Sequence, residues 1–376
     1  MTQSRFDTVP VRAKMPFVGR DAQLALLVDA YEQVATHGAS RIVSIVGDAG
    51  MGKSRLLYEF LRGLAGKDVL ALNGGSAPYG SGAAYRPGIR ILHQYFNIAD
   101  ADDAQAIQQK VAGRIVALSG GTASAVFPIL ALLNALPADN PFHRLPNKEK
   151  RQHVSDALLW LGQRLTTERA MVLAYEDLQW VTADTQELAG AAGARASAED
   201  AAAVLTYRSD HDASSLMTPD TIEARLDGLE PSATRALITE LLGDDRSLDA
   251  LKDELPERSG GNPLFIEELV RSMIESGDLT GEPGYYRMDS PHEIVEIPRT
   301  VRAVLAARID RLGRTDKHVL QALAAVGDVA SVGLLARRAR GPGRRDSQIA
   351  CAGCRPRDCS SSEPRASICR TNSSTR

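Results

Sequence analysis

The first 350 residues of the chain contain no cysteine, so disulfide bonds play no part in folding the body of the protein. Long apolar runs are missing as well. The longest nearly apolar stretch, AVFPILALLNAL at 125–136, is too short to span a bilayer and is typical of a buried helix. The first twenty residues lack the apolar core of a signal peptide. We therefore expect a cytoplasmic protein with no membrane segment.

The body of the chain also lacks an excess of basic residues. The whole chain has a formal net charge of −3, whereas residues 340–376 carry eight Arg, no Lys and three acidic residues. The net charge of +5 in that tail leaves −8 for the rest of the chain. Because sequence-independent binding of nucleic acid requires a basic face, we do not expect nucleic acid to be a partner.

Four short apolar runs predict the buried strands of a parallel sheet. Helical patterns lie between these runs, an alternation that indicates an α/β fold with a doubly wound parallel sheet. From about residue 231 the strand signal disappears, and amphipathic helical patterns follow. The four runs are RIVSIV at 41–46, VLAL at 69–72, AMVLAY at 170–175 and AAAVLTY at 201–207.

The segment GDAGMGKS at 47–54 matches the pattern G-x-x-x-x-G-K-[ST] directly after the first predicted strand. Gly47, Gly50 and Gly52 allow the backbone to curl so that several N–H groups face one point, and the next helix adds the positive end of its dipole. Lys53 can then reach the β- and γ-phosphates of a nucleotide, and the Ser54 hydroxyl can bind Mg²⁺. A chance match is the alternative, but strand, loop and helix follow in the required order.

Charged residues follow two further predicted strands. Glu176 and Asp177 end the third strand, and Arg208 ends the fourth. The carboxyl ends of parallel strands are where such sheets bind ligands, so we expect these residues to act in catalysis. Either carboxylate could bind Mg²⁺ while the other orients water, since the usual order of Asp then Glu is reversed. A solvated acidic turn and a solvent-facing Arg are the alternatives.

Further segments of the chain resemble motifs of one protein family. Together they are similar to the signal-transduction ATPases of the STAND type, and more narrowly to the ATPase module that follows the catalytic domain in large bacterial class III adenylate/guanylate cyclase proteins. The resemblance extends over about residues 5–335. The segments are FVGR at 17–20, AYRPGIRILHQYF at 84–96, YEDLQW at 175–180, LTYR at 205–208, GGNPLFIEELV at 260–270 and IPRTVRAVLAARIDRL at 297–312.

This resemblance implies roles for residues that the other patterns leave unassigned. Val18, Gly19 and Arg20 would lie near the adenine of ATP or ADP, and Pro263 would pack on the base. The helical domain would cover the nucleotide and shift when ADP is replaced by ATP. One departure is Gln179, which stands where the family usually has His.

The resemblance and the composition together divide the chain into five segments. The sheet domain would be followed by a helical lid and by part of a winged-helix-like helical domain. The segments are a linker at 1–16, a P-loop NTPase core at 17–215, the helical lid at 216–296, the start of the winged-helix-like domain at 297–339 and a disordered basic tail at 340–376.

The tail contains all four cysteines of the chain, three of them in CAGCRPRDC at 351–359. A zinc site or a redox pair would suit the Cys-x-x-Cys spacing, but no hydrophobic pattern holds the cysteines together. Arg, Gly, Ser, Pro and Cys are what GC-rich coding DNA yields when it is read out of frame. We therefore expect a truncated protein whose tail results from a frameshift.

The function that these patterns favour is a nucleotide switch in signal transduction or regulation. The chain would bind ATP and Mg²⁺, hydrolyse ATP slowly and act on a protein partner or through self-association. No paired metal-binding aspartates of a cyclase are present, so we expect no cyclase activity. The alternatives are a fragment of a cyclase-type regulator, the ATPase part of a transcriptional regulator, or an inactive remnant.

Overall fold

The computed structural model of the chain describes residues 16–75, 85–119, 124–181 and 201–288. Most of the predicted linker, winged-helix-like segment and tail, including the cysteine-rich stretch 351–359, lies outside the described residues. Short described pieces follow residue 288, at 305–306, 309–310, 312–313, 316–321, 329–331 and 368–370.

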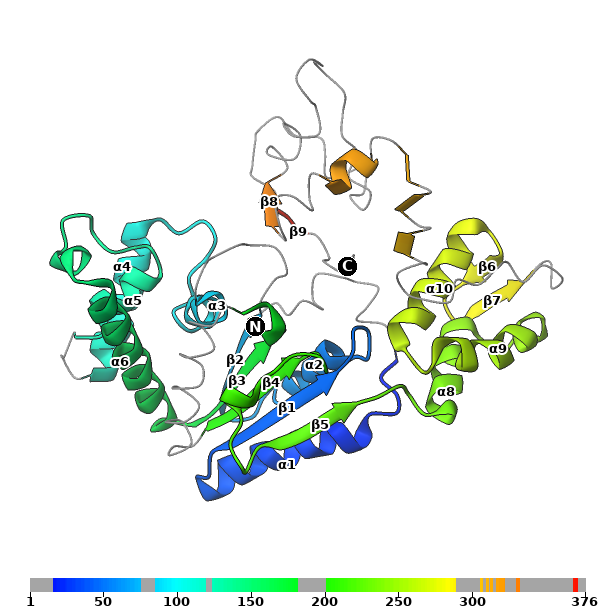
Figure 1. Cartoon of the computed structure of the whole chain (residues 1–376), viewed down its shortest axis with the longest axis horizontal. Coiled ribbons are helices and arrows are strands. Elements are labelled where there is room, and N and C mark those ends of the chain that lie inside the picture. Colours follow the sequence, from blue (N-terminus) through cyan, green and yellow to red (C-terminus); the bar gives the residue numbers. More distant parts are fainter. Residues whose placement is uncertain are drawn as a thin grey trace, which may run out of the picture.

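A five-stranded sheet lies at the centre of the structure (Figure 1), in the order β2-β3-β4-β1-β5 with every neighbouring pair parallel. Register brings the carboxyl ends of the strands to one edge: Val46 lies opposite Tyr207, and Gly47 lies opposite Leu226. The strands are β1 (Arg41–Gly47), β2 (Val69–Gly75), β3 (Ala170–Glu176), β4 (Ala201–Tyr207) and β5 (Ile222–Leu226).

The four predicted strands are confirmed, and β5 is a strand that the sequence analysis missed. Its sequence, IEARL, places exposed Glu223 and Arg225 between less exposed residues, because only one face of this edge strand is buried. A continuous apolar run is therefore absent there. β5 lies within the segment 216–296 that we assigned to the helical lid, although it belongs to the central sheet.

Both faces of the sheet are buried, as the doubly wound fold requires. On one face α1 (Asp21–His37) and α2 (Lys53–Gly63) pack on alternate strand residues such as Val43 and Ile45. On the other face Leu178 and Leu216, which follow β3 and β4, pack on the intervening residues of β1. The predicted α/β fold is therefore present.

A group of helices lies beyond the β2 edge of the sheet (Figure 1). The predicted buried helix at 125–136 is part of it, as α5, whose Val126, Ile129 and Leu130 are buried. The helices are α3 (Arg86–Tyr95), α4 (Ala104–Ser119), α5 (Val126–Leu132) and α6 (Asn147–Thr166).

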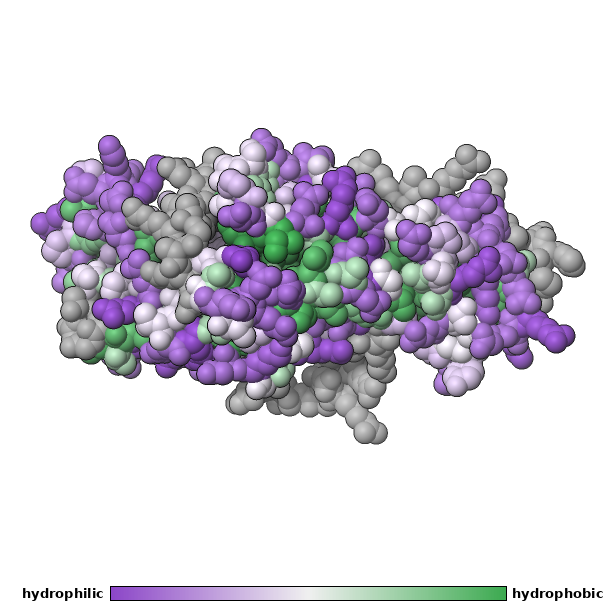
Figure 2. Space-filling view, turned by 90° about the horizontal axis from the view of Figure 1, so that it is seen from below, coloured by the Kyte–Doolittle hydropathy of each residue, from purple (hydrophilic) through white to green (hydrophobic). Residues whose placement is uncertain are grey.

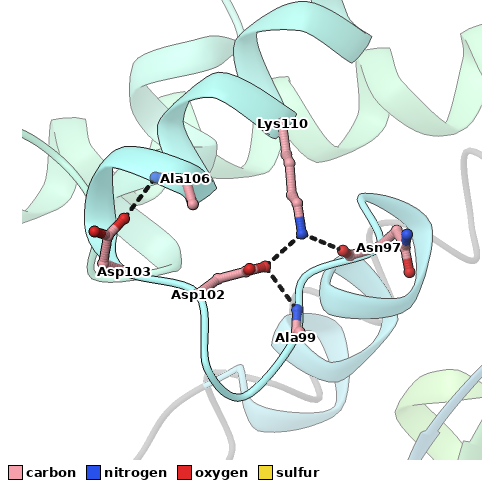
Figure 3. A network of polar contacts seen from close by, with 6 residues as sticks. All are labelled: Asn97, Ala99, Asp102, Asp103, Ala106 and Lys110. Atoms are coloured by element: carbon pink, nitrogen blue, oxygen red, sulfur yellow. Dashed lines mark hydrogen bonds and ion pairs between the residues drawn. The ribbon is translucent and has the colours of Figure 1, made fainter.

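Polar contacts fix the loop between α3 and α4 (Figure 3). Lys110 of α4 forms an ion pair of 2.5 Å with Asp102 and donates a hydrogen bond of 2.8 Å to the Asn97 carbonyl. The Asp102 carboxylate also accepts the Ala99 N–H at 2.7 Å. These bonds, above all the one from Lys110, lower the pKa of Asp102. The network is a structural feature of this helical group.

A second helical group, which we call the lid, lies beyond β5 (Figure 1). Its helices over 231–242 and 263–276 match predicted helical patterns, whereas the helix over 249–259 was not predicted. The lid also contains an antiparallel hairpin, so the expectation that strands end near residue 231 is wrong. The Pro-Gly pair at 283–284 is the turn signal that marks this hairpin. The elements are α8 (Pro231–Leu242), α9 (Asp249–Ser259), α10 (Pro263–Ser276), β6 (Leu279–Glu282) and β7 (Tyr285–Met288).

Several short elements occur outside these groups. A small antiparallel pair joins two segments near the end of the chain, and short 3-10 helices occur in the loops. They are β8 (Val329–Ser331), β9 (Ile368–Arg370), η2 (Pro141–Arg144), η3 (Leu178–Trp180), η4 (Ser214–Leu216) and η5 (Arg246–Leu248).

The surface in the view of Figure 2 is mostly hydrophilic, with hydrophobic residues gathered in a band near its middle. Within the described part of the chain, no helix is long and apolar enough to cross a membrane.

We predict that Ile45→Ala lowers the free energy of unfolding by about 2–5 kcal/mol, because Ile45 is fully buried in the centre of the sheet and the truncation leaves a cavity. Val116→Ala, at a side chain of α4 that is 44% exposed, is the control and should change it by less than about 0.5 kcal/mol. Urea denaturation measures both. Equal effects would contradict the placement of β1 in the core.

Candidate functional site

The segment 47–54, which we call the P-loop, runs from the last residue of the buried strand β1 through a tight loop into the first turn of the helix α2. Gly50 and Gly52 have φ angles of +88° and +92°, which side chains other than glycine rarely adopt. Gly52 is the N-cap of α2 and has no side chain to bond the free N–H groups of the first turn. These N–H groups and the helix dipole favour an anion at this position.

Lys53 is the charged centre of the P-loop. Its side chain is 8% exposed, and its ammonium donates to the carbonyls of Gly47 at 2.6 Å and Asp48 at 2.9 Å. Burial lowers the pKa of Lys53, Asp177 and Asp48 raise it, and the positive charge of Arg208 lowers it further. A buried cation is therefore held at the carboxyl edge of the sheet.

Gly47 fixes the start of the loop against the neighbouring strand. A Cβ atom at this position would lie 2.5 Å from the Leu226 carbonyl oxygen of β5. Any side chain here would push β1 and β5 apart, so the close approach of the two strands requires glycine.

Asp177 lies at the end of β3 in a strained backbone conformation, with φ +59°. Its N–H donates to the hydroxyl of Thr206 on β4 at 3.0 Å, and its carboxylate accepts the side-chain amide of Gln179 at 3.2 Å. Thr206 thus fixes the backbone of Asp177, and Gln179 bonds the carboxylate, whose charge acts on Lys53.

The side chain of Glu176 contacts β2, the neighbour of β3 on the side away from β4. The residue is 5% exposed, and its carboxylate accepts the side-chain amide of Asn73, in β2, at 2.8 Å. Gln94 of α3 holds Asn73 in turn, through bonds to its backbone N–H and carbonyl. The two neighbouring carboxylates therefore have different surroundings.

Arg208 follows β4, the strand between β1 and β3. Its guanidinium carbon lies 5.3 Å from the centre of the Trp180 ring, within the range of a cation–π contact. Its charge acts on Lys53, so Lys53, Asp177 and Arg208 meet at one edge of the sheet.

The FVGR segment connects the sheet, the P-loop and the lid. Val18 packs against the lid core, and a Cβ at Gly19 would lie 2.5 Å from the Cβ of Ala233 on α8. Arg20 is buried and donates to the carbonyls of Met51 and Asp227. Burial lowers the pKa of Arg20. The segment thus lies beside the P-loop.

The lid reaches the P-loop through the start of α10. Asn262 is the N-cap of this helix, and its side-chain amide donates to the Ala49 carbonyl at 3.2 Å. The backbone N–H of Leu264 lies 3.4 Å from the Gly50 carbonyl, which it faces as a donor. Pro263 stands between these two residues in the first turn of α10. The structure therefore brings the predicted residues at 18–20, 47–54 and 263 to the same loop.

Asn73, Thr206 and Asn262 are three residues of this site that the sequence analysis did not single out. A polar residue at the end of a predicted strand, as in VLALN, is a signal that could have found Asn73. Thr206 reads as an ordinary β-branched strand residue, and Asn262 reads as a helix cap. Only the fold reveals their partners.

Among the described residues no three His, Cys, Asp or Glu side chains are grouped so that they could hold a metal ion by themselves. The hard oxygen donors predicted for the site are the Ser54 hydroxyl and the carboxylates of Glu176 and Asp177. Mg²⁺ commonly takes one or two carboxylates together with phosphate and water oxygens, so this donor set suits a metal that arrives with a nucleotide.

Several known proteins are similar to this chain. An uncharacterized protein of Rhizobium meliloti (strain 1021) is 26% identical over 326 residues, which are 85% of this chain. The chain spans 30% of the length of that relative.

Among solved structures, the Orc1 protein of Aeropyrum pernix in complex with DNA matches with a TM-score of 0.44 and 13% identity, over 92% of this chain and 84% of that one. A STAND protein with a tetratricopeptide repeat sensor from Pyrococcus horikoshii matches with a TM-score of 0.38 and 12% identity, over 82% of this chain and 34% of that one. Similarity at this level carries no argument about ligands or partners.

Two family matches cover the sheet domain and the lid separately. Residues 230–281 match a domain of unknown function. Residues 16–205, from the FVGR segment through most of β4, match the AAA ATPase domain. The second match covers half of the chain and includes the P-loop and both carboxylates. The chain therefore belongs to the AAA ATPase domain family, whose members bind nucleotides.

Proposed function

We propose that the chain is a nucleotide switch that binds ATP with Mg²⁺, hydrolyses it slowly and changes the position of the lid. The observation that carries this proposal is the position of Lys53. Its buried ammonium lies where the charges of Asp177 and Arg208 act on it, in a loop that the lid itself contacts.

In this proposal the P-loop binds the phosphates. Lys53 would exchange its bonds with the Gly47 and Asp48 carbonyls for bonds with the β- and γ-phosphates, while the N–H groups of the loop and the start of α2 bind the remaining oxygens. Arg208 would leave the Trp180 ring to contact the γ-phosphate. A phosphate group at this edge also neutralises the repulsion between the two cations.

Mg²⁺ would bind Ser54 and Asp177, and it would neutralise part of the phosphate charge. We assign the metal to Asp177 because its charge acts on Lys53, whereas Glu176 is bonded to Asn73 on the far side of β3. Glu176 would then orient the attacking water. The Asn73 amide, bonded to one carboxylate oxygen, would hold the Glu176 side chain in place for this role.

The adenine would lie between the FVGR segment and the start of α10. Val18 and Gly19 contact the lid, Arg20 contacts the P-loop, and Pro263 begins the lid helix that faces it. A base at this position would touch sheet domain and lid together. Replacement of ADP by ATP could therefore bias the lid between two positions.

The resemblance to ATPase modules of cyclase-associated regulators supports a role in signal transduction, with a protein partner or a second copy as the target. A cytoplasmic location and the absence of a nucleic-acid partner stay predictions from the sequence. The lid is the part through which a nucleotide-dependent change would be passed on.

We expect Lys53→Ala to weaken ATP and ADP binding by at least about 10-fold, because hydrogen bonds from a charged group to the phosphates are lost. Lys110→Ala, which removes a lysine paired with Asp102 in the other helical group, should leave affinity unchanged. Isothermal titration calorimetry with and without Mg²⁺ measures both. A wild-type chain that binds neither nucleotide would overturn the proposed function.

Glu176→Gln should lower the rate of ATP hydrolysis by about 100-fold or more while ATP affinity changes little, since a general base typically contributes 10²–10⁴-fold. The amide keeps the size of the side chain and its contact with Asn73. Phosphate release under single-turnover conditions is the measurement. Hydrolysis that persists in Glu176→Gln and stops in Asp177→Asn would reverse the two assignments.

A further inference from the structure

The tip of the P-loop is bonded to the lid through its carbonyl groups. The Ala49 carbonyl accepts the side-chain amide of Asn262, and the Gly50 carbonyl faces the Leu264 N–H. The approach is close: a Cβ at Gly50 would lie 2.6 Å from the Asn262 side-chain oxygen and 2.9 Å from the Leu264 Cβ. Glycine at position 50 is therefore required for the lid to dock, as well as for the shape of the loop.

Asn262 uses both halves of its carboxamide. Its oxygen accepts the Phe265 N–H at 3.2 Å and so caps α10, while its nitrogen donates to Ala49 at 3.2 Å. Ser and Asp cap helices as well as Asn does, but Asp has no donor and the hydroxyl of Ser is too short to bridge to another loop. The helix start alone does not require Asn, whereas the bridge to the P-loop does.

We propose that Asn262 is a positioning residue that couples the lid to nucleotide binding by orienting the peptide between Ala49 and Gly50. This inference rests on the proposed function. In this trans peptide the Ala49 carbonyl is held by the lid, so the Gly50 N–H points to the opposite side, where the phosphates would bind. A docked lid thus preorganises the P-loop, and by linkage a bound nucleotide favours the docked lid.

The test compares two Asn→Ser variants of the full chain. Asn262→Ser keeps a cap for α10 and removes the bridge. Asn140→Ser is the matched control, because Asn140 also caps a helix, with its side-chain oxygen 2.9 Å from the Phe142 N–H, but lies in the other helical group. Hydrogen exchange of the Leu264 and Phe265 amides is measured without nucleotide, and ADP affinity is measured by calorimetry.

In Asn262→Ser the Leu264 amide should exchange about 3- to 10-fold faster and ADP should bind about 3- to 10-fold more weakly, the range that one lost hydrogen bond produces. The Phe265 amide should exchange at the wild-type rate, because its cap remains. Asn140→Ser should change neither Leu264 exchange nor ADP affinity.

Unchanged exchange at Leu264 in Asn262→Ser would overturn the inference, as would faster exchange with unchanged ADP affinity, since the contact would then not position the P-loop. An equal loss of affinity in Asn140→Ser would also overturn it. A wild-type chain that binds no ADP would overturn the proposed function instead, and Leu264 exchange would still decide whether Asn262 holds the lid.

Discussion

The burial of the Lys53 ammonium at the end of β1 is the interaction on which the rest of the site depends. A cation that is 8% exposed needs compensation, and the carbonyls of Gly47 and Asp48 and the charge of Asp177 supply it. This compensation requires β1 to end at the same edge as β3 and β4, which the parallel order of the sheet guarantees. The fold thus creates a site whose buried positive charge would be stabilised by a bound anion.

The same loop is also where the lid is attached. Arg20 contacts the P-loop from the FVGR segment, and Asn262 contacts it from α10. Val18 and Gly19 contact the lid as well, so the FVGR segment, the P-loop and the lid are all in mutual contact. Any ligand that reshapes the P-loop therefore changes contacts of the lid. A nucleotide switch needs such shared contacts, because a ligand shifts a conformation only by binding two states with different affinity.

The sequence predicts the centre of this structure better than its borders. Strands β1, β3 and β4 lie inside the sheet and, like the edge strand β2, read as continuous apolar runs. The other edge strand, β5, carries exposed Glu223 and Arg225 and shows no such run. The β6–β7 hairpin was missed because four-residue strands give only a weak signal. The P-loop was predictable because its glycines and lysine are fixed by local geometry.

The partners within the site could not be read from the sequence in the same way. The bond between Asn73 and Glu176 joins residues 103 positions apart, and the one between Asn262 and Ala49 joins residues 213 positions apart. Such pairs depend on strand order and on how the lid docks, which no local pattern encodes. The sequence leaves open which of Glu176 and Asp177 binds Mg²⁺ and which orients water. Only their different partners in the structure suggest separate roles.

The central claim is that the nucleotide on the P-loop sets the position of the lid. Hydrogen exchange of the wild-type chain with Mg²⁺ and either no nucleotide, ADP or a non-hydrolysable ATP analogue tests it most directly. We predict that both nucleotides slow exchange in residues 47–54, and that exchange at the start of α10 differs between ADP and the analogue. Slower exchange in the P-loop with no difference anywhere in the lid would contradict the account.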